Sequence, residues 1–142
     1  MAIASILKDK GDTIIAASPA QTVADVVALL CEHRIGAVIV MEGGAVAGVL
    51  SERDIVRGLH EQGAAILQRP VRDIMTTEVI TVAPSESVTA ALSRMTRRRI
   101  RHLPVLEGGQ VRGVVSIGDL VKARIDEAVR EAESLKDYIA HA

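Results

Sequence analysis

The hydrophobic and polar positions of the chain follow the same order twice. Each half begins with a short extended stretch, at 13–17 and at 78–82, followed by a proline and several polar residues. A stripe of apolar residues with helical spacing comes next, and Thr22 and Ser87 stand where a helix N-cap is expected. The stripes consist of Val23, Val26, Val27 and Leu30, and of Val88, Ala91, Leu92 and Met95.

Two apolar strands joined by a glycine pair follow each of these helices. The predicted strands span 37–41 and 46–50 in the first half, and 103–106 and 111–115 in the second. Two glycines between such strands indicate a tight hairpin. A further helix begins at Ser51 and at Ser116, so each half is predicted to be β-α-β-β-α.

The two halves are copies of one unit. Without a gap, residues 14–57 align with residues 79–122, and 15 of the 44 aligned positions are identical. Self-similarity of this length indicates one supersecondary unit used twice. Because such a unit alone buries little apolar surface, we expect the two copies to pack against each other.

The last helix is predicted to continue past the repeat, from Asp119 to about Ala140. It carries an apolar stripe that suits packing on the body or on another subunit. The residues of this stripe are Leu120, Val121, Ile125, Val129, Leu135 and Ile139.

Composition narrows the classes of function. The net charge is −1 and aromatic residues make up 1% of the chain, which disfavours nucleic-acid binding and leaves no aromatic platforms for stacked bases. The lone cysteine, Cys31, is expected to be a small buried apolar residue. No targeting segment and no long apolar run are recognisable, so we expect a soluble, cytoplasmic protein without a membrane partner.

One motif with chemical potential occurs in both halves. It reads GVLSERD at 48–54 and GVVSIGD at 113–119, and places Ser51 three residues before Asp54 and Ser116 three before Asp119. This spacing fits a helix capping box. It also fits a ligand site, because a helix N-terminus attracts anions and a carboxylate can accept two hydrogen bonds from a ribose diol.

These segments resemble the cystathionine beta-synthase (CBS) domain pair, or Bateman module. The resemblance rests on the two GVxSxxD segments, on RIGAVIVMEGG and RIRHLPVLEGG, and on Ile74-Met75-Thr76. It implies an α+β fold in which two tandem repeats pack sheet to sheet with pseudo-twofold symmetry. The expected parts are repeat 1 at 1–65, repeat 2 at 66–125 and a C-terminal helical extension at 126–142, as in small stand-alone bacterial CBS-pair proteins.

The family resemblance also implies a function. CBS pairs bind adenine nucleotides such as AMP, ADP, ATP, NAD or S-adenosylmethionine in clefts between the repeats, and signal occupancy by a conformational change. Such a protein requires no cofactor, carries out no catalysis, and regulates a partner that the sequence does not identify. By the same resemblance we expect a disc-shaped homodimer.

Residues of the two expected clefts follow from the family's motifs. Asp54 and Asp119 correspond to the ribose-binding aspartate, and Ser51 and Ser116 to the neighbouring hydroxyl residue. The adenine is expected against backbone and apolar groups at Ile15, Ile80, Ile35, Gly36, Ala37, Ile100, Arg101 and His102. Each cleft should draw on both repeats, so that Asp119 shares a site with Ile15 and Ile35, and Asp54 shares a site with Ile80 and Ile100.

The clefts are expected to differ in affinity. The second repeat carries arginines at 94, 97, 98, 99 and 101, and the matching stretch of the first repeat carries only Arg34. We expect Arg101 and His102 to hold phosphate, and Arg94, Arg97 and Arg98 to form a solvated helix face. The residues before the two aspartates also differ, being Arg53 in one cleft and Gly118 in the other.

Two functions other than nucleotide sensing are also compatible with parts of the sequence. Binding of phosphate or nucleic acid through the 94–101 basic run would give strong salt dependence. A module that only binds proteins, with serines and aspartates that only cap helices, would not respond to any nucleotide. An enzyme is not expected, since there is no phosphate-binding glycine loop, no set of catalytic groups and no spacing of histidines for a metal site.

Overall fold

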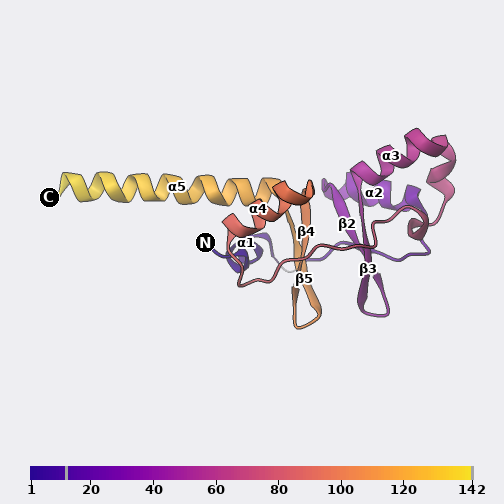
Figure 1. The fold of residues 1–142 in the computed structure, drawn as a ribbon, viewed down its shortest axis with the longest axis horizontal. Helices are drawn as coiled ribbons and strands as arrows, with labels where there is room; N and C mark the ends of the chain where they lie inside the picture. Colours follow the sequence, from indigo (N-terminus) through magenta and orange to yellow (C-terminus); the bar gives the residue numbers. More distant parts are fainter. Residues whose placement is uncertain (12, 142) are drawn as a thin grey trace.

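The structure, a computed structural model, describes residues 1–11 and 13–141. Helices and strands alternate in two similar halves, followed by one long helix (Figure 1). In chain order the elements are α1 (Ile3–Lys10), β1 (Ala16–Ala17), α2 (Val23–His33), β2 (Ala37–Glu42), β3 (Ala45–Ser51), α3 (Glu52–Gln62), the 3-10 helices η1 (Gly63–Gln68) and η2 (Val71–Asp73), α4 (Val88–Arg98), β4 (His102–Glu107), β5 (Gln110–Ser116) and α5 (Ile117–Ala140). The predicted α+β class and the long last helix are confirmed.

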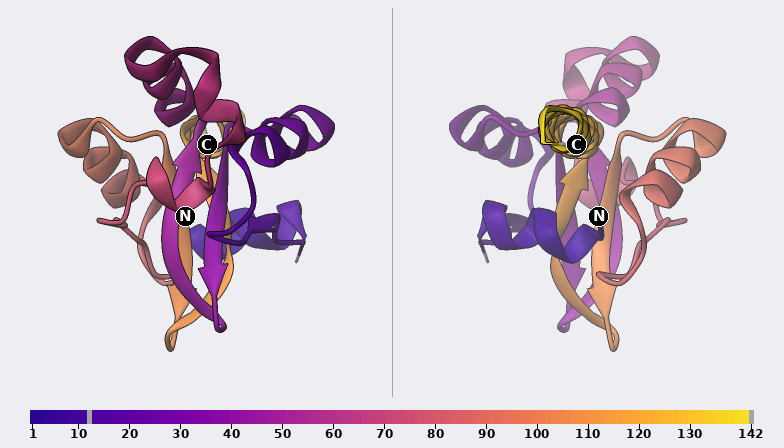
Figure 2. Two further views of the ribbon diagram at one scale, coloured as in Figure 1. Left: turned by 90° about the vertical axis from the view of Figure 1, so that its right-hand side faces the viewer. Right: turned by 90° about the vertical axis from the view of Figure 1, so that its left-hand side faces the viewer.

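A β-hairpin forms the centre of each half. Strands β2 and β3 pair antiparallel, as do β4 and β5, and both ladders shift register at equivalent points, after Val40 and after Val105. The glycine pairs at both turns have positive φ angles, as a tight two-residue turn requires. The hairpins of the two halves face each other between the surrounding helices (Figures 1 and 2).

The first strand of each unit is shorter than the sequence predicts. In the first half it consists of Ala16 and Ala17, parallel to β2. In the second half it is a single bridge between Val82 and Val105. Val82 donates to the carbonyl of Pro104 and accepts from Leu106, at 3.0 Å each. The parallel pairing does not continue to earlier residues, because Pro104 has no N–H to donate to the backbone carbonyl two residues before Val82.

The helix starts agree with the sequence, whereas the prediction for Cys31 was wrong. Thr22 and Ser87 cap α2 and α4, and Ser51 and Ser116 cap α3 and α5. The buried face of α2 consists of Val23, Val26 and Leu30. Cys31 is exposed, because its position next to Leu30 turns it about 100° away from that face.

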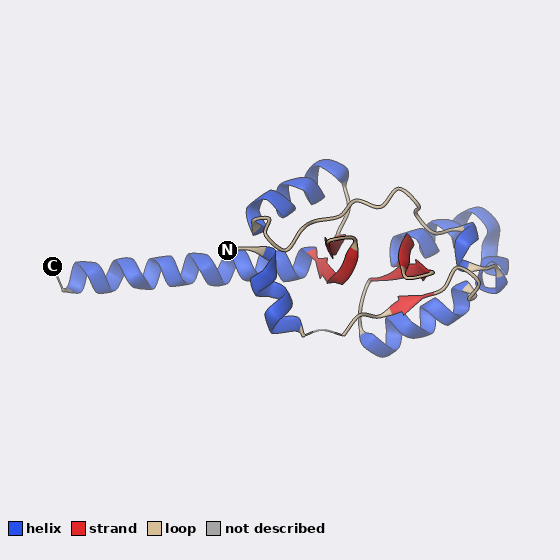
Figure 3. Cartoon of the chain, turned by 90° about the horizontal axis from the view of Figure 1, so that it is seen from below, coloured by secondary structure: helices blue, strands red, loops and turns tan. Residues whose placement is uncertain are grey.

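The N-terminal helix α1 was not foreseen, and it packs on the second half. Ile3 and Ile6 belong to the apolar cluster around Leu103 and Val115, as the position of α1 beside β5 and α5 requires (Figure 3). The segment before the second repeat packs on the first half in the same way, since Ile66 and Val71 join the cluster of that half.

The backbone contacts of these two leading segments match pair by pair. The N–H of Ile3 donates to the carbonyl of Glu86 at 2.9 Å, and the N–H of Val71 donates to the carbonyl of Gln21 at 2.7 Å. Glu86 and Gln21 occupy the same position of the repeat. Helix α1, which precedes the first half in sequence, therefore packs on the second half. The segment with Ile66 and Val71, which precedes the second half, packs on the first.

One arginine of the basic run is structural, so the prediction of a solvated face was wrong for it. Arg94 binds both carboxylate oxygens of Glu86 and donates to the carbonyl of Thr81 at 2.8 Å. The hydrogen bond from Arg94 and one from the Ala83 N–H hold the pKa of Glu86 below its ordinary value. These bonds tie α4 to the turn that precedes it.

Replacing Glu86 with glutamine is therefore expected to lower the free energy of unfolding by about 1 kcal/mol at pH 7. Since the pKa of Glu86 is lowered by folding, the contribution is complete above about pH 4.3 and is lost as the pH falls through the folded-state pKa. Urea unfolding at pH 7 and pH 3 checks this. E107Q, at the more exposed Arg112 pair, is the control. An equal loss at both pH values would contradict the explanation.

Candidate functional site

Two cavities lie between the halves, each at the start of a helix that follows a hairpin. The Asp54 cavity has a volume of about 290 Å³ and lies at the N-terminus of α3. The Asp119 cavity has a volume of about 380 Å³ and lies at the N-terminus of α5. Both are lined by residues of both halves, because the strand ends of one hairpin face the loops before the other.

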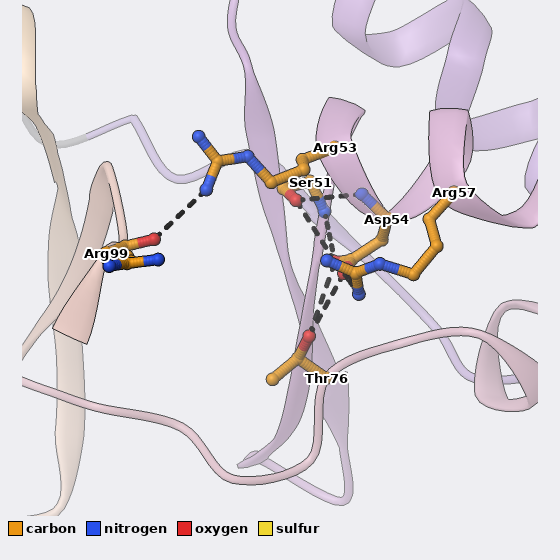
Figure 4. A network of polar contacts seen from close by, with 6 residues as sticks. All are labelled: Ser51, Arg53, Asp54, Arg57, Thr76 and Arg99. Carbon is orange, nitrogen blue, oxygen red and sulfur yellow. Dashed lines mark hydrogen bonds and ion pairs between the residues drawn. The ribbon is translucent and has the colours of Figure 1, made fainter.

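Asp54 is a buried carboxylate held by the local fold. It is 9% exposed, and its Oδ2 accepts hydrogen bonds from the backbone N–H of Ser51 at 3.0 Å and from the Ser51 hydroxyl at 3.1 Å. The hydroxyl of Thr76 donates to Oδ1 at 3.2 Å (Figure 4). Arg57 lies 3.6 Å from Oδ1. A capping box thus fixes the carboxylate at the cavity wall, while two hydroxyls show which kind of donor it takes.

Arginines outnumber carboxylates in the lining of the Asp54 cavity. Its lining includes five arginines, namely Arg53, Arg57, Arg98, Arg99 and Arg101, against three carboxylates, Glu52, Asp54 and Glu78. Arg53 crosses the cavity from α3 and donates to the backbone carbonyl of Arg99 at 3.1 Å. Arg99 has a left-handed backbone with φ of 54°, which turns its carbonyl toward α3. Forked guanidinium donors of this number suit an anion with several oxygens.

Asp119 has the same capping geometry but a different neighbour. The Ser116 N–H donates to its Oδ2 at 2.8 Å, and the ammonium group of Lys10 donates to the same oxygen at 2.8 Å. Lys10 also donates to the carbonyl of Val114 at 2.9 Å. Burial would raise the pKa of Asp119, but the bonds from Lys10 and Ser116 outweigh it and hold the pKa below its ordinary value. In the Asp54 cavity, the carboxylate accepts instead from the uncharged hydroxyl of Thr76.

His102 lies between the two cavities and lines both. A Cβ atom added to Gly36 would lie 2.9 Å from its Nε2, so the ring fills the space that this glycine leaves open. Burial lowers the pKa of His102, although the nearby Glu52 carboxylate acts in the opposite direction. The ring is thus neutral at pH 7 and can donate or accept a hydrogen bond on either side.

The sequence matches the family model of the CBS domain twice, over residues 11–61 and 71–126. The chain belongs to the CBS domain family. Its two repeats form a CBS pair, as the resemblance predicted.

Known relatives agree with this assignment. The mitochondrial CBS domain-containing protein CBSX3 of Arabidopsis thaliana is 38% identical, over 96% of this chain and 71% of its own length. The crystal structure of the CBS-domain containing protein ATU1752 from Agrobacterium tumefaciens superposes with a TM-score of 0.85 at 37% identity, covering 87% of this chain and 99% of that one. The CBS pair of protein MJ0100, solved in complex with 5′-methylthioadenosine and S-adenosyl-L-methionine, shares the fold with a TM-score of 0.79 at 22% identity, covering 89% and 98%.

The CBS pair brings together most of the residues that the motifs had suggested. The Asp54 cavity contains Ser51, Arg53, Asp54, Ile80, Ile100, Arg101 and His102. The Asp119 cavity contains Ile15, Ile35, Gly36, Ala37, His102, Ser116 and Asp119. Gly118 lines neither cavity; it is exposed in the first turn of α5.

Three residues that contact Asp54 or Asp119 were not predicted as site residues from the sequence. Thr76 was noted only as part of the Ile74-Met75-Thr76 motif, and Arg57 lies one helical turn after Asp54. Lys10 lies 109 residues from Asp119. Among residues 1–11 and 13–141, no group of three His, Cys, Asp or Glu side chains has an arrangement that could hold a metal ion.

Proposed function

We propose that this CBS pair binds adenine nucleotides in the Asp54 and Asp119 cavities and reports their occupancy to a partner protein. The observation that carries the proposal is the pairing, in both cavities, of a capped carboxylate at a helix N-terminus with apolar residues of the opposite repeat. The complex of MJ0100 with two adenosine derivatives adds support from a protein of the same fold.

Each part of an adenine nucleotide has a chemical counterpart in the Asp54 cavity. The ribose diol donates to Asp54, whose oxygens already accept from hydroxyl groups. The adenine lies against the half-buried Ile80 and Ile100. Phosphates face Arg53, Arg101 and the other cationic side chains. The Asp119 cavity offers the same carboxylate and a wall formed by Ile15 and Ile35, but its cations are Lys10 and Arg34.

Occupancy is transmitted through the packing of the repeats. Because each cavity has walls from both repeats, a ligand that contacts both walls stabilises one relative position of the repeats over others. The long helix α5 starts at Asp119's own cap, so a shift at that cavity moves its far end. The proposal contains no catalytic step, and it leaves the identity of the nucleotide and the regulated protein to experiment.

The distribution of the basic run favours a small phosphorylated ligand over nucleic acid. Arg94 is paired with Glu86, while Arg98, Arg99 and Arg101 line the Asp54 cavity. Among residues 1–11 and 13–141, no helix is both long and apolar enough for a membrane span. The cytoplasmic location and the disc-shaped homodimer stay predictions.

Thermal unfolding with a panel of nucleotides tests the function. At one hundred times its dissociation constant, a ligand should add about 2.7 kcal/mol, which raises Tm by several degrees. The panel contains AMP, ADP, ATP, NAD and S-adenosylmethionine, with GMP as the base control. A shift with one or more adenine compounds at low and moderate salt, and none with GMP, is expected. No shift with any of them would leave a module that only binds proteins.

A further inference from the structure

Within the part of the chain that the structure describes, His102 alone lines both cavities. It begins β4, and its ring lies against Gly36, the residue before β2. The equivalent position of the first repeat is Ala37, which lines the Asp119 cavity but not the other one. A single imidazole ring therefore separates two sites that the repeat otherwise makes equivalent.

Backbone hydrogen bonds connect the surroundings of this ring to both helix N-termini. The carbonyl of Gly36, which the ring contacts, accepts from the N–H of Glu52 at 2.9 Å. The carbonyl of Arg101, next to His102 in sequence, accepts from the N–H of Ile117 at 2.8 Å. Glu52 and Ile117 are the first residues of α3 and α5. The ring is thus held between the two N-termini, and a ligand in either cavity meets the same side chain.

The protonation of this ring depends on its burial and on charges from four segments. Burial is the largest influence and lowers the pKa of His102. Glu52 on α3 and Asp119 on α5 favour the charged ring. Arg101, directly before it, and Lys10 on α1 disfavour that form. Two acidic and two basic groups thus oppose each other, and an anion in either cavity adds a negative neighbour that favours the imidazolium.

We propose that His102 is a proton acceptor shared by the two cavities, so that an anionic ligand in either one binds together with a proton from the solvent. This role rests on the proposed function, to which it adds a link between the two sites. Since one ring serves both cavities, the proton that is taken up with the first anion also stabilises the second. Occupancy of one cavity thus changes the affinity of the other, and the effect is reciprocal.

The pH dependence of binding is the first test. ADP-ribose is a suitable probe, because its pyrophosphate diester does not itself titrate near neutral pH. Since the anion prefers the protonated ring, its affinity should fall by up to about ten-fold as the pH rises from about 5.5 to about 8.5. H102N should remove this dependence. H60N, which changes an exposed histidine outside both cavities, is the matched control and should keep it.

Proton uptake distinguishes a shared ring from one that serves a single cavity. Calorimetric titration in buffers of different ionisation enthalpy counts the protons that enter with ADP-ribose. D54N and D119N keep the shape of the two carboxylates, and each weakens binding in one cavity. Both variants should still take up a fraction of a proton with the ligand in the remaining cavity. H102N should take up none, and the native chain should take up at most about one proton for two ligands.

The possible outcomes separate this role from the proposed function. Proton uptake that persists in H102N, or that survives in only one of D54N and D119N, would overturn the shared role and leave nucleotide binding in place. Titration of the His102 ring by NMR extends the test to any anionic nucleotide that binds. The pKa of His102 should rise on saturation, and an unchanged pKa would also overturn the shared role. If no nucleotide binds the native chain, both the function and this role are wrong.

Discussion

Adenosine is expected to bind the Asp119 cavity about ten-fold more tightly after Lys10 is replaced by methionine. In the native chain, the ammonium group of Lys10 donates to Oδ2 of Asp119 at 2.8 Å. In the proposed function, the ribose diol donates to this same carboxylate. A hydrogen bond between charged groups contributes about 1.5–3 kcal/mol, of which a nucleoside recovers only part when it displaces the ammonium group. AMP gains less from the substitution, because its phosphate loses Lys10 as a cation. Calorimetric titration with adenosine and AMP gives the ratio of the two affinities.

The control for this experiment is K8M, which removes an exposed lysine from the same helix. The pH dependence supplies a second readout. In the native chain the pKa of Asp119 is held below its ordinary value, so its ion pair stabilises the fold above about pH 3.9 and is lost as the pH falls through the folded-state pKa. In K10M that loss should move to higher pH. If K10M and K8M had the same ratio of adenosine to AMP affinity, Lys10 would not control access to the cavity.

Gly48→Ala is expected to destabilise the protein by about 1–3 kcal/mol, and Gly113→Ala by clearly less. The two glycines occupy the same position of the repeat. A Cβ atom at Gly48 would lie 2.7 Å from the backbone carbonyl oxygen of Thr76, which cannot move without breaking two 2.9 Å bonds with Val49. At Gly113 the nearest atom is Cδ2 of Leu7 at 2.9 Å, the end of a flexible side chain.

Urea unfolding of the two variants measures this difference, and each serves as the control for the other. G48A should also weaken ligand binding in the Asp54 cavity, because Thr76 donates to Asp54. Binding in the Asp119 cavity should be preserved. Equal destabilisation of both variants would show that the backbone contact at Thr76 yields as easily as a leucine side chain.

Local patterns in the sequence were sufficient for the repeat and most of its elements. Helix caps such as Ser51 depend on residues three positions away, and the hairpin turns depend on adjacent glycines. The first strand of the second unit could not be predicted in the same way. Its length depends on a missing N–H at Pro104, which matters only once that residue faces the strand.

Contacts between residues far apart in the sequence could not be predicted from local patterns. Ile3, Ile6 and Leu7 match Val71, Ile74 and Met75, but three additional residues, 8–10, separate them from the rest of the first repeat. An alignment without gaps therefore misses α1. Lys10 is one of those additional residues, and its bond to Asp119 distinguishes one cavity from the other. The motif around Asp119 contains no sign of it, since the two groups meet only in the folded chain.

The two repeats complete their folds at different stages of synthesis, because each packs with the segment that precedes the other repeat in sequence. Helix α1 leaves the ribosome before either repeat, but its partners Pro84 and Glu86 follow about eighty residues later. The first repeat can pack against the segment that follows it in sequence as soon as residue 76 has emerged. The second repeat must wait for a contact of long sequence separation, which folds slowly. Helix α1 is thus translated before both repeats but is among the last elements to reach its place, and until then its apolar side chains are open to other contacts.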